Sequence, residues 1–316
     1  MKNCNEITRD LLKRRDEYAA KQRRRRKTAV VSAVCFCLIA GVGLGLWRGG
    51  VFTPGRAVQN ESSPPEVHYE GYAVSIPPIE IPQSEEGVSA DMIGLVVYRG
   101  GIYTETSRYY GDDAQALYSL VGEYLGYATG TIDEWSSQDE YSREFASTCT
   151  GDVYSVNGYD TGFRICMCQN IEGANGEQIL WLQFYERLNG IGVTYGSDLF
   201  GDRLNMAGNW NEVLYNSHES WDNGVSAYMP LPGITESDIE SFLSALYSGE
   251  FEYVYDTDKN FYDSGKTQGH LFFTMNDGTK IELRLFEGGY VGYQDMGWYF
   301  VKMPGEDFDK VFDAIT

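Results

Sequence analysis

The chain is poor in histidine and proline, and beyond residue 27 it is poor in basic side chains. It has 3 His and 9 Pro among 316 residues. The histidines, His68, His218 and His270, are far apart, and neither H-x-x-x-H nor C-x-x-C spacing occurs, so no zinc-type site is predicted. A nucleophile elbow, a phosphate-binding glycine loop and the protein-kinase motifs are also missing from the sequence. We therefore expect a protein that is not an enzyme and that holds no cofactor and no metal.

Basic residues are concentrated at the start of the chain. Residues 1–27 hold 11 Lys+Arg and 4 Asp+Glu, a net charge of +7. The whole chain holds 25 Lys+Arg and 46 Asp+Glu, which leaves 14 basic and 42 acidic residues, a net charge of −28, for residues 28–316. Such a region repels phosphate groups, which disfavours nucleic-acid binding, and we expect no nucleic-acid partner.

An uncharged apolar run follows the basic segment directly. It extends from Thr28 to Trp47, and a helix of this length would be roughly 30 Å long, enough to cross a bilayer. The residues that set its topology are the five basic ones before it and the interfacial aromatic after it: Arg23, Arg24, Arg25, Arg26, Lys27 and Trp47. We expect a single-pass protein of the cell membrane, with the lipid bilayer as a partner, a cytoplasmic N-terminus and an extracellular C-terminal domain.

Two other interpretations of this run are weaker. A cleaved signal peptide has a short basic region, a shorter apolar core and small residues at the cleavage site. Here the basic segment is long, and Leu44 to Arg48 is a poor cleavage site. Cys35 and Cys37 lie in the middle of the run, where a lipoprotein cysteine would not be.

The basic segment itself is predicted to contain a short helix. Ile7, Leu11 and Tyr18 lie on one narrow stripe of such a helix, which could dock on a cytoplasmic protein or on anionic lipid. The alternative is that the segment only fixes the orientation of the anchor.

Residues 48–90 are rich in Pro, Gly, Ser and Glu. Proline removes backbone donors and restricts the residue before it, so we expect an extended stalk, with residues 76–81 lying on the domain that follows.

The first part of the ectodomain is predicted to be strands with helices between them. MIGLVVYRGGIYTETSRYY is typical of a hairpin that turns at Gly100–Gly101. A helix is expected from Asp112 or Asp113 to Gly126, and a short one at 138–147. The buried face of the first helix would comprise Leu117, Leu120, Val121, Tyr124 and Leu125. Further strands are expected at 153–156, 163–168 and 179–186, with a turn at Asn157–Gly158.

The last part has the clearest local signals. Thr235 is predicted to cap a helix and Asp238 to complete a capping box, with Gly249 at the end. The apolar face of this helix comprises Ile239, Phe242, Leu243, Leu246 and Tyr247. Strands are expected at 251–255, 270–275, 280–286 and 298–302, with a hairpin turn at 276–278 and a closing helix at 306–315.

These elements define the predicted fold class and organisation. The fold class is α+β: a short cytoplasmic helix, one transmembrane helix, an extended stalk and an ectodomain of antiparallel sheets with packed helices. FYERLNGIGVTYG and RLFEGGYVGYQ follow similar helix–strand orders, which indicates two related lobes, with chance similarity as the competing explanation. The predicted segments are a tail (1–27), a membrane helix (28–47), a stalk (48–90) and lobes at 91–233 and 234–316.

Several segments carry a resemblance to known proteins. EITRDLLKRRDEYAAKQRRRRK followed by one span, and then ADMIGLVVYRGGIYTETSRYY, GDVYSVNGYDTGFRICM and GGYVGYQDMGWYFVKMPGEDFDKVF, resemble a group of uncharacterised single-pass membrane proteins of low-GC Gram-positive bacteria. Some of these are similar in layout to membrane-bound anti-sigma factors. The resemblance implies signalling through the cytoplasmic tail and carries over no catalytic residue.

The remaining candidate residues leave alternatives open. Cys149 could pair with Cys166 or with Cys168, or the three could be small buried apolar residues. Four acidic or amide residues at 256–263 suggest a calcium loop only superficially, because the glycine and glutamate that an EF-hand requires are missing. The 24 tyrosines indicate either a binding face or half-exposed sheet positions without a ligand.

The function expected from these observations is a non-enzymatic cell-surface binding or sensing module, possible ligands being a cell-wall component or a peptide. The alternatives are a cell-wall-active enzyme with an unrecognised carboxylate site and a purely structural surface protein. Two carboxylates roughly 5–10 Å apart in a cleft would favour the enzyme, and a flat tyrosine or tryptophan face would favour binding.

Overall fold

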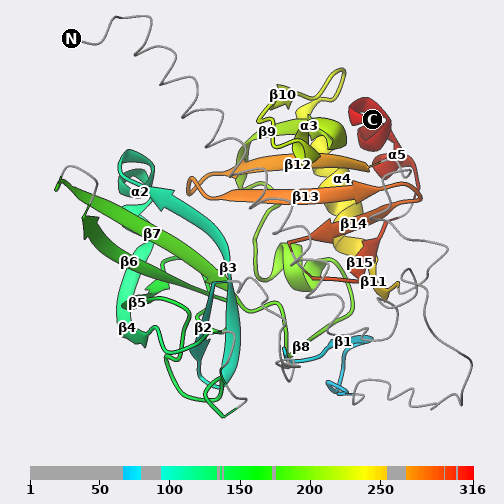
Figure 1. Ribbon diagram of the computed structural model, residues 1–316. Helices are drawn as coiled ribbons and strands as arrows, with labels where there is room; N and C mark the ends of the chain where they lie inside the picture. The colour runs from blue at the N-terminus through cyan, green and yellow to red at the C-terminus, as the bar shows by residue number, and fades with distance from the viewer. Residues whose placement is uncertain are drawn as a thin grey trace, which may run out of the picture.

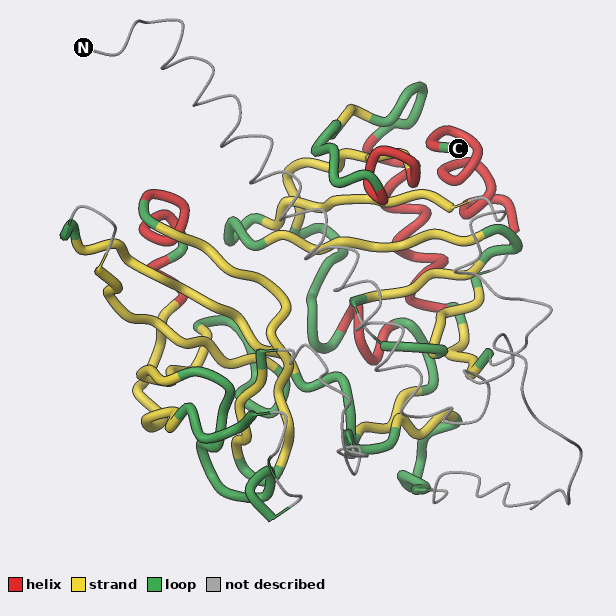
Figure 2. The backbone as a smooth tube through the Cα atoms, in the orientation of Figure 1, coloured by secondary structure: helices red, strands yellow, loops and turns green. Residues whose placement is uncertain are grey.

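Antiparallel β-sheets dominate the structure (Figures 1 and 2). The computed structural model describes residues 67–79, 94–133, 136, 139–172, 176–254, 268–294, 296–303 and 305–316. Within these ranges the strands form a six-stranded sheet, a seven-stranded sheet and a two-stranded ribbon.

The six-stranded sheet has the strand order β2-β3-β7-β6-β5-β4. Its strands are β2 (Leu95–Tyr98), β3 (Gly101–Tyr110), β4 (Val121–Thr129), β5 (Thr150–Val156), β6 (Arg164–Glu172) and β7 (Gln178–Glu186). The short helices α2 (Asp112–Ala116) and η1 (Tyr118–Leu120) cover one face, where Leu117 and Leu120 pack on Cys166 and Phe184. A separate cluster around Tyr103 lies on the other face.

The seven-stranded sheet has the strand order β10-β9-β12-β13-β14-β15-β11. Its strands are β9 (Trp210–Ser217), β10 (Met229–Pro230), β11 (Glu250–Tyr253), β12 (Gln268–Met275), β13 (Lys280–Phe286), β14 (Tyr290–Tyr293) and β15 (Tyr299–Lys302). The helices α4 (Glu236–Ser248) and α5 (Gly305–Ile315) pack on one face. Successive side chains of β12 point to opposite faces of the sheet. Leu271 and Phe273 are buried toward α4 and α5, whereas His270 lies on the outer face, under α3 (His218–Asp222).

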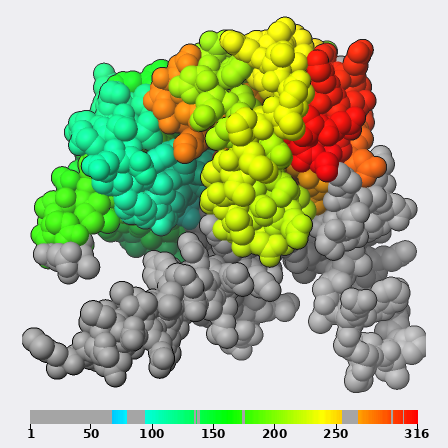
Figure 3. All heavy atoms as spheres, turned by 90° about the horizontal axis from the view of Figure 1, so that it is seen from above, coloured from blue at the N-terminus to red at the C-terminus, as the bar shows by residue number. Residues whose placement is uncertain are grey.

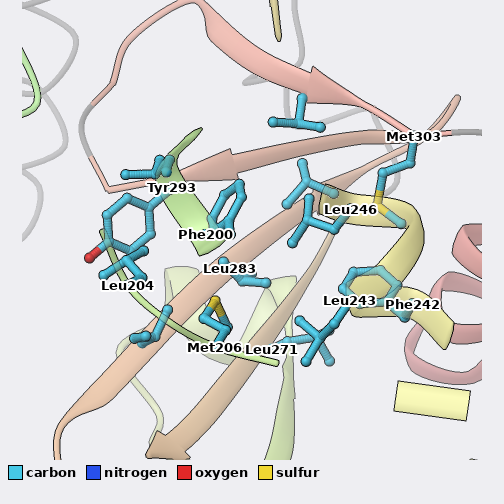
Figure 4. Packing of buried hydrophobic residues seen from close by; sticks show 14 of the residues in the cluster. Phe200, Leu204, Met206, Phe242, Leu243, Leu246, Leu271, Leu283, Tyr293 and Met303 are labelled. Atoms are coloured by element: carbon cyan, nitrogen blue, oxygen red, sulfur yellow. The ribbon is translucent and has the colours of Figure 1, made fainter. Parts of the chain in front are cut away.

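The core beneath α4 draws on distant parts of the chain. Figure 4 shows Phe242, Leu243 and Leu246 of α4 close to Leu271 and Leu283 of the sheet. The π-helical turn η2 (Ser197–Gly201) adds Phe200 and Leu199 to the same core. The ribbon of β1 (Val74–Ile76) and β8 (Ile191–Val193) adds Ile76 and Val193.

A buried polar network joins the two large sheets, which pack side by side (Figures 1 and 3). Arg164 of β6 pairs with Glu186 of β7, with Nε 2.9 Å from Oε1, and only 3% and 1% of their surfaces are exposed. The hydroxyl of Tyr293, in β14, donates to the other oxygen of Glu186 at 2.7 Å. A second link runs from the hydroxyl of Tyr159 to Asp277 Oδ2, at 2.7 Å.

The strong local signals of the last part are confirmed. Thr235 and Asp238 form the predicted capping box, and Gly249 ends α4. The hairpin between β12 and β13 turns at 276–278, where Gly278 has φ +87°. The predicted strand at 280–286 matches β13 (Lys280–Phe286). The lobe boundary expected at 233/234 comes after β9 and β10 in the chain. These two strands pair in the seven-stranded sheet together with β11 to β15, so this sheet contains strands from both sides of the expected boundary.

The helix predicted from residue 112 to residue 126 is wrong beyond Leu120. α2 ends at Ala116, a single 3₁₀ turn follows, and Val121 begins β4. Gly122 would have been in the interior of this helix, where glycine costs about 1 kcal/mol relative to alanine, and Gly126 would have been at its end. In the sheet they allow close packing, because a Cβ would overlap Ser155 at Gly122 and the ring of Phe145 at Gly126. The short helix predicted at 138–147 is also wrong, since residues 139–145 form turns and a bend.

The predicted fold class needs correction. Strands hold 43% and helices 20% of the described residues, so the protein is mainly a β-protein and not a balanced α+β one. In this part of the chain no helix has both the length and the apolar character needed to cross a membrane. The predicted tail helix, membrane helix and calcium-loop residues lie outside the described residues, as does the stalk apart from 67–79.

Candidate functional site

Three tyrosines stand out from the edge of the six-stranded sheet. Tyr118 is 50% exposed, Tyr124 59% and Tyr127 54%. The ring of Tyr124 meets the ring of Tyr154 edge to face, with centres 5.7 Å apart and an angle of 71°. We call Tyr118, Tyr124, Tyr127 and Tyr154 the tyrosine patch.

A β-bulge explains why Tyr124 and Tyr127 lie on the same face although they are three residues apart. Tyr124 is opposite Tyr154, but Gly126 is opposite Val153 and Tyr127 is opposite Asp152. One extra residue, Leu125, is therefore inserted in β4. A bulge of this kind reverses the alternation of the strand and redirects the side chains beyond it.

The elements that carry the patch also carry acidic residues. β4 carries Glu123, β5 carries Asp152, and α2, which leads into η1, begins with Asp112 and Asp113. Burial, followed by the charge of Asp152, raises the pKa of the Tyr154 hydroxyl. This hydroxyl therefore stays protonated at neutral pH and can act as a hydrogen-bond donor.

β4 is also a sheet edge. It comes last in the strand order, and no other described strand pairs with its outer side. Among the described residues one end of this edge is covered, where Thr129 N donates to Phe145 O at 3.0 Å and Gly130 N donates to Ser147 Oγ at 2.9 Å. An uncovered edge presents backbone donors and acceptors that another strand can use.

A second aromatic surface lies on the opposite face of the same sheet. The rings of Tyr110 and Trp181 are nearly parallel, at 9°, with centres 6.5 Å apart, and the Arg108 guanidinium lies 5.8 Å from the Trp181 ring. Arg108 is already paired with Glu105 through two contacts of 2.7 and 2.6 Å. Its charge is thus neutralised within the protein, which makes this surface the weaker candidate for binding a charged ligand.

Two histidines that are distant in sequence meet on the outer face of the seven-stranded sheet. His270 is fully buried, and its Nδ1 lies 2.9 Å from Glu282 Oε1. Its Nε2 lies 3.2 Å from His218 Nδ1, with the two ring planes within 6° of each other. Trp221 stacks on His270 with ring centres 4.3 Å apart. Because of the β9–β12 register, in which His270 faces Asn216, the start of α3 lies beside β12.

Burial is the main cause that lowers the pKa of both histidines. The pKa of His218 is lowered further by the charge of Arg284 and by His270. For His270 the hydrogen bond to Glu282 opposes this lowering of the pKa without reversing it. Both imidazoles are therefore neutral at neutral pH. Two buried polar atoms beside them, Asn216 Oδ1 and Gln268 Nε2, have no hydrogen-bond partner within the described structure.

The cysteines and the possible metal ligands form no further site. Cys149 Sγ lies 3.7 Å from Met167 Sδ and 3.3 Å from the Tyr185 hydroxyl, and Cys149, Cys166 and Cys168 are free. Cys149 packs on the face of the sheet opposite to Cys166 and Cys168. In the ranges that the structure describes, no group of three or more His, Cys, Asp or Glu side chains is placed to hold a metal ion.

The residues singled out in the sequence do not coincide with these sites. The topology residues 23–27 and Trp47, and the docking residues Ile7, Leu11 and Tyr18, lie outside the described residues. Sequence reasoning placed Tyr124 on a buried helical face and missed the patch. The histidine pair was missed as well, and the sequence held no signal for it, because only the strand register brings the two residues together.

Comparison of the chain with protein-family models, with curated proteins and with solved structures finds no match. The resemblance to membrane proteins and anti-sigma factors therefore stays an expectation, and the function has to be argued from the geometry of the sites.

Proposed function

We propose that the protein is a non-catalytic binding module that takes an extended, positively charged peptide segment along β4. The observation that supports this is the tyrosine patch, in which three rings are at least half exposed and the carboxylate of Asp152 lies across the strand pair from Tyr127. Clustered exposed aromatic side chains are typical of interaction sites, whereas isolated ones are not.

The patch favours a cation for two reasons. The face of a tyrosine ring attracts an ammonium or guanidinium group, by about 0.5–1 kcal/mol at an exposed site. Asp152 lies directly across the strand pair from Tyr127, so a basic side chain over that ring also meets a carboxylate. The acidic surface should in addition steer a basic partner toward the protein, which makes association sensitive to salt.

The strand edge favours an extended peptide. A peptide added beside β4 would use the backbone groups of the edge for affinity, and its alternate side chains would lie over the patch for selectivity. The bulge at Leu125 adds to this selectivity because it places two rings, Tyr124 and Tyr127, on the same face.

The test is a binding measurement with synthetic peptides of about ten residues, a length that can pair with one edge strand. A peptide that alternates Lys and Thr should bind, and its Glu–Thr counterpart should not. The double substitution Tyr124→Ala and Tyr127→Ala should weaken binding roughly tenfold, the sum of two ring contacts. Tyr195→Ala is the matched control, because Tyr195 is 46% exposed but lies outside the six-stranded sheet.

Three results would contradict the proposal. One is equal binding of the Lys and Glu peptides. Another is an equal loss in the Tyr195→Ala control. The third is salt-independent binding of a neutral glucan at the same tyrosines, which would identify a saccharide as the ligand.

A further inference from the structure

A single chain of hydrogen bonds fastens α3 to the seven-stranded sheet. It runs from Glu282 on β13 through His270 on β12 to His218 on α3, with steps of 2.9 and 3.2 Å. The chain is independent of the tyrosine patch, which belongs to the other large sheet.

The chain has a limited capacity for protons. With Glu282 ionised, His270 donates through Nδ1–H, and its bare Nε2 accepts from His218 Nδ1–H. One extra proton can be accommodated, because one imidazole still offers a lone pair at the junction between the rings. A second extra proton cannot, because His270 Nε2–H and His218 Nδ1–H would then point at each other.

The surroundings also resist protonation. The charged groups that face the pair are Glu282 and Arg284 on β13 and Asp222 on α3, and β9 contributes the neutral Asn216. Arg284 lies 5.0 Å from the Trp221 ring, which stacks on His270. A second imidazolium would therefore be buried beside an existing guanidinium, a costly arrangement.

The segment that carries α3 adds no buried side chain to the core. None of the five residues of α3 is buried. Its other attachments are the stacking of Trp221 on His270 and the contact of Trp221 with Arg284. In addition, Asn216 Nδ2 donates to Val225 O at 2.9 Å, and the ring of Tyr228 meets that of Phe272 at 4.8 Å. Segments with few buried apolar contacts open locally at a low free-energy cost.

We propose that the Glu282–His270–His218 chain is a proton-operated latch. It holds residues 217–225 on the outer face of the sheet while at least one imidazole is neutral, and it releases them when both are protonated. The two protons come from solvent, and no covalent bond changes.

The direction of the pH dependence follows from the lowered pKa of both histidines. The docked state prefers neutral imidazoles, and the released state titrates near the ordinary value of 6.5. Docking is therefore fully favourable above this pH and is lost as the pH falls below it. The docking equilibrium changes by up to about tenfold per pH unit for each proton taken up.

The experiment is hydrogen–deuterium exchange of the full chain at about pH 7.5 and about pH 5, corrected for the intrinsic pH dependence of exchange, across the range where histidine titrates. Amides of 217–225 should lose at least about tenfold of their protection at the lower pH. Amides of α4 should keep theirs. His218→Gln keeps a side chain that can donate to His270 Nε2 or accept from it, and it removes the second imidazolium, so residues 217–225 of this variant should keep their protection at the lower pH. The matched control is His68→Gln, because His68 is the exposed histidine outside the cluster.

Two outcomes would overturn the latch. One is unchanged protection of 217–225 between the two pH values. The other is the same loss of protection in His218→Gln as in the unaltered chain. If α4 loses protection together with α3, the proton acts on the whole fold and the local latch is likewise refuted.

Discussion

Replacing Glu186 by glutamine should destabilise the protein strongly, although the two side chains have the same shape. Glu186 accepts hydrogen bonds from Arg164 and from Tyr293, and both members of the ion pair are almost completely buried. The amide oxygen can still accept hydrogen bonds, but the side chain no longer carries the charge that compensates the guanidinium. The substitution therefore leaves an uncompensated charge inside the protein.

The magnitude follows from the burial. Removing one partner of a buried ion pair costs about 3–5 kcal/mol, a large part of the roughly 5–15 kcal/mol that holds a typical domain together. If the free energy of unfolding falls by about 3 kcal/mol for each molar of urea, the urea concentration at the unfolding midpoint should fall by about 1–2 M. Intrinsic tryptophan fluorescence in urea titrations at neutral pH measures this shift.

The paired substitution Arg164→Met with Glu186→Leu provides the control. It removes both charges and fills similar volume, so it should be within about 1–2 kcal/mol of the unaltered protein or more stable than it. If Glu186→Gln unfolds at the same midpoint as the unaltered chain, or if the pair is as unstable as the single variant, the buried charge is not the source of the energy.

Two further predictions concern α4. Leu243→Ala removes a fully buried side chain and should lower the free energy of unfolding by about 2–5 kcal/mol in the same urea titration. The control Ser244→Ala changes an exposed position and should alter this free energy little. Equal unfolding midpoints for the two variants would contradict the prediction. The hydrogen bond from Lys310, followed by those from Thr235, lowers the pKa of Asp238 to about 2. The ionised carboxylate therefore stabilises the folded state fully at pH values above the ordinary pKa of aspartate. This stabilisation is lost as the pH falls toward the lowered pKa. NMR titration of the Asp238 carboxyl should show the low midpoint, and Lys310→Met should raise it; an unchanged midpoint in that variant would refute the assignment.

The parts of the fold that were predictable from sequence are those set by neighbouring residues. The capping box of Thr235 and Asp238 and the turn at 276–278 depend on contacts within a few positions, and both occur as expected. The segment 117–125 was not predictable in this way. Its apolar spacing fits a helical face, but pairing with β5 selects a bulged strand, and the only local sign was the pair of glycines, Gly122 and Gly126.

The candidate sites depend on long-range pairing and were therefore beyond the reach of the sequence. Tyr124 and Tyr127 share a face only because Leu125 is the extra residue of a bulge. His218 and His270 are 52 positions apart, and the antiparallel register of β9 and β12 brings them together. Composition indicated that tyrosine is abundant but not where the exposed rings would gather.

The core beneath α4 has a consequence for how the chain can be divided. Ile76, Phe163 and Val193, which precede the seven-stranded sheet in the chain, are buried in the same cluster as Leu243 and Leu271. A fragment that began at β9 would leave this cluster open on one side and expose apolar surface at a cost of about 25 cal/mol for each Å². During synthesis, β1 must wait for a partner surface that emerges more than 100 residues after Ile76, so the last third of the sequence completes a core to which Ile76 already belongs.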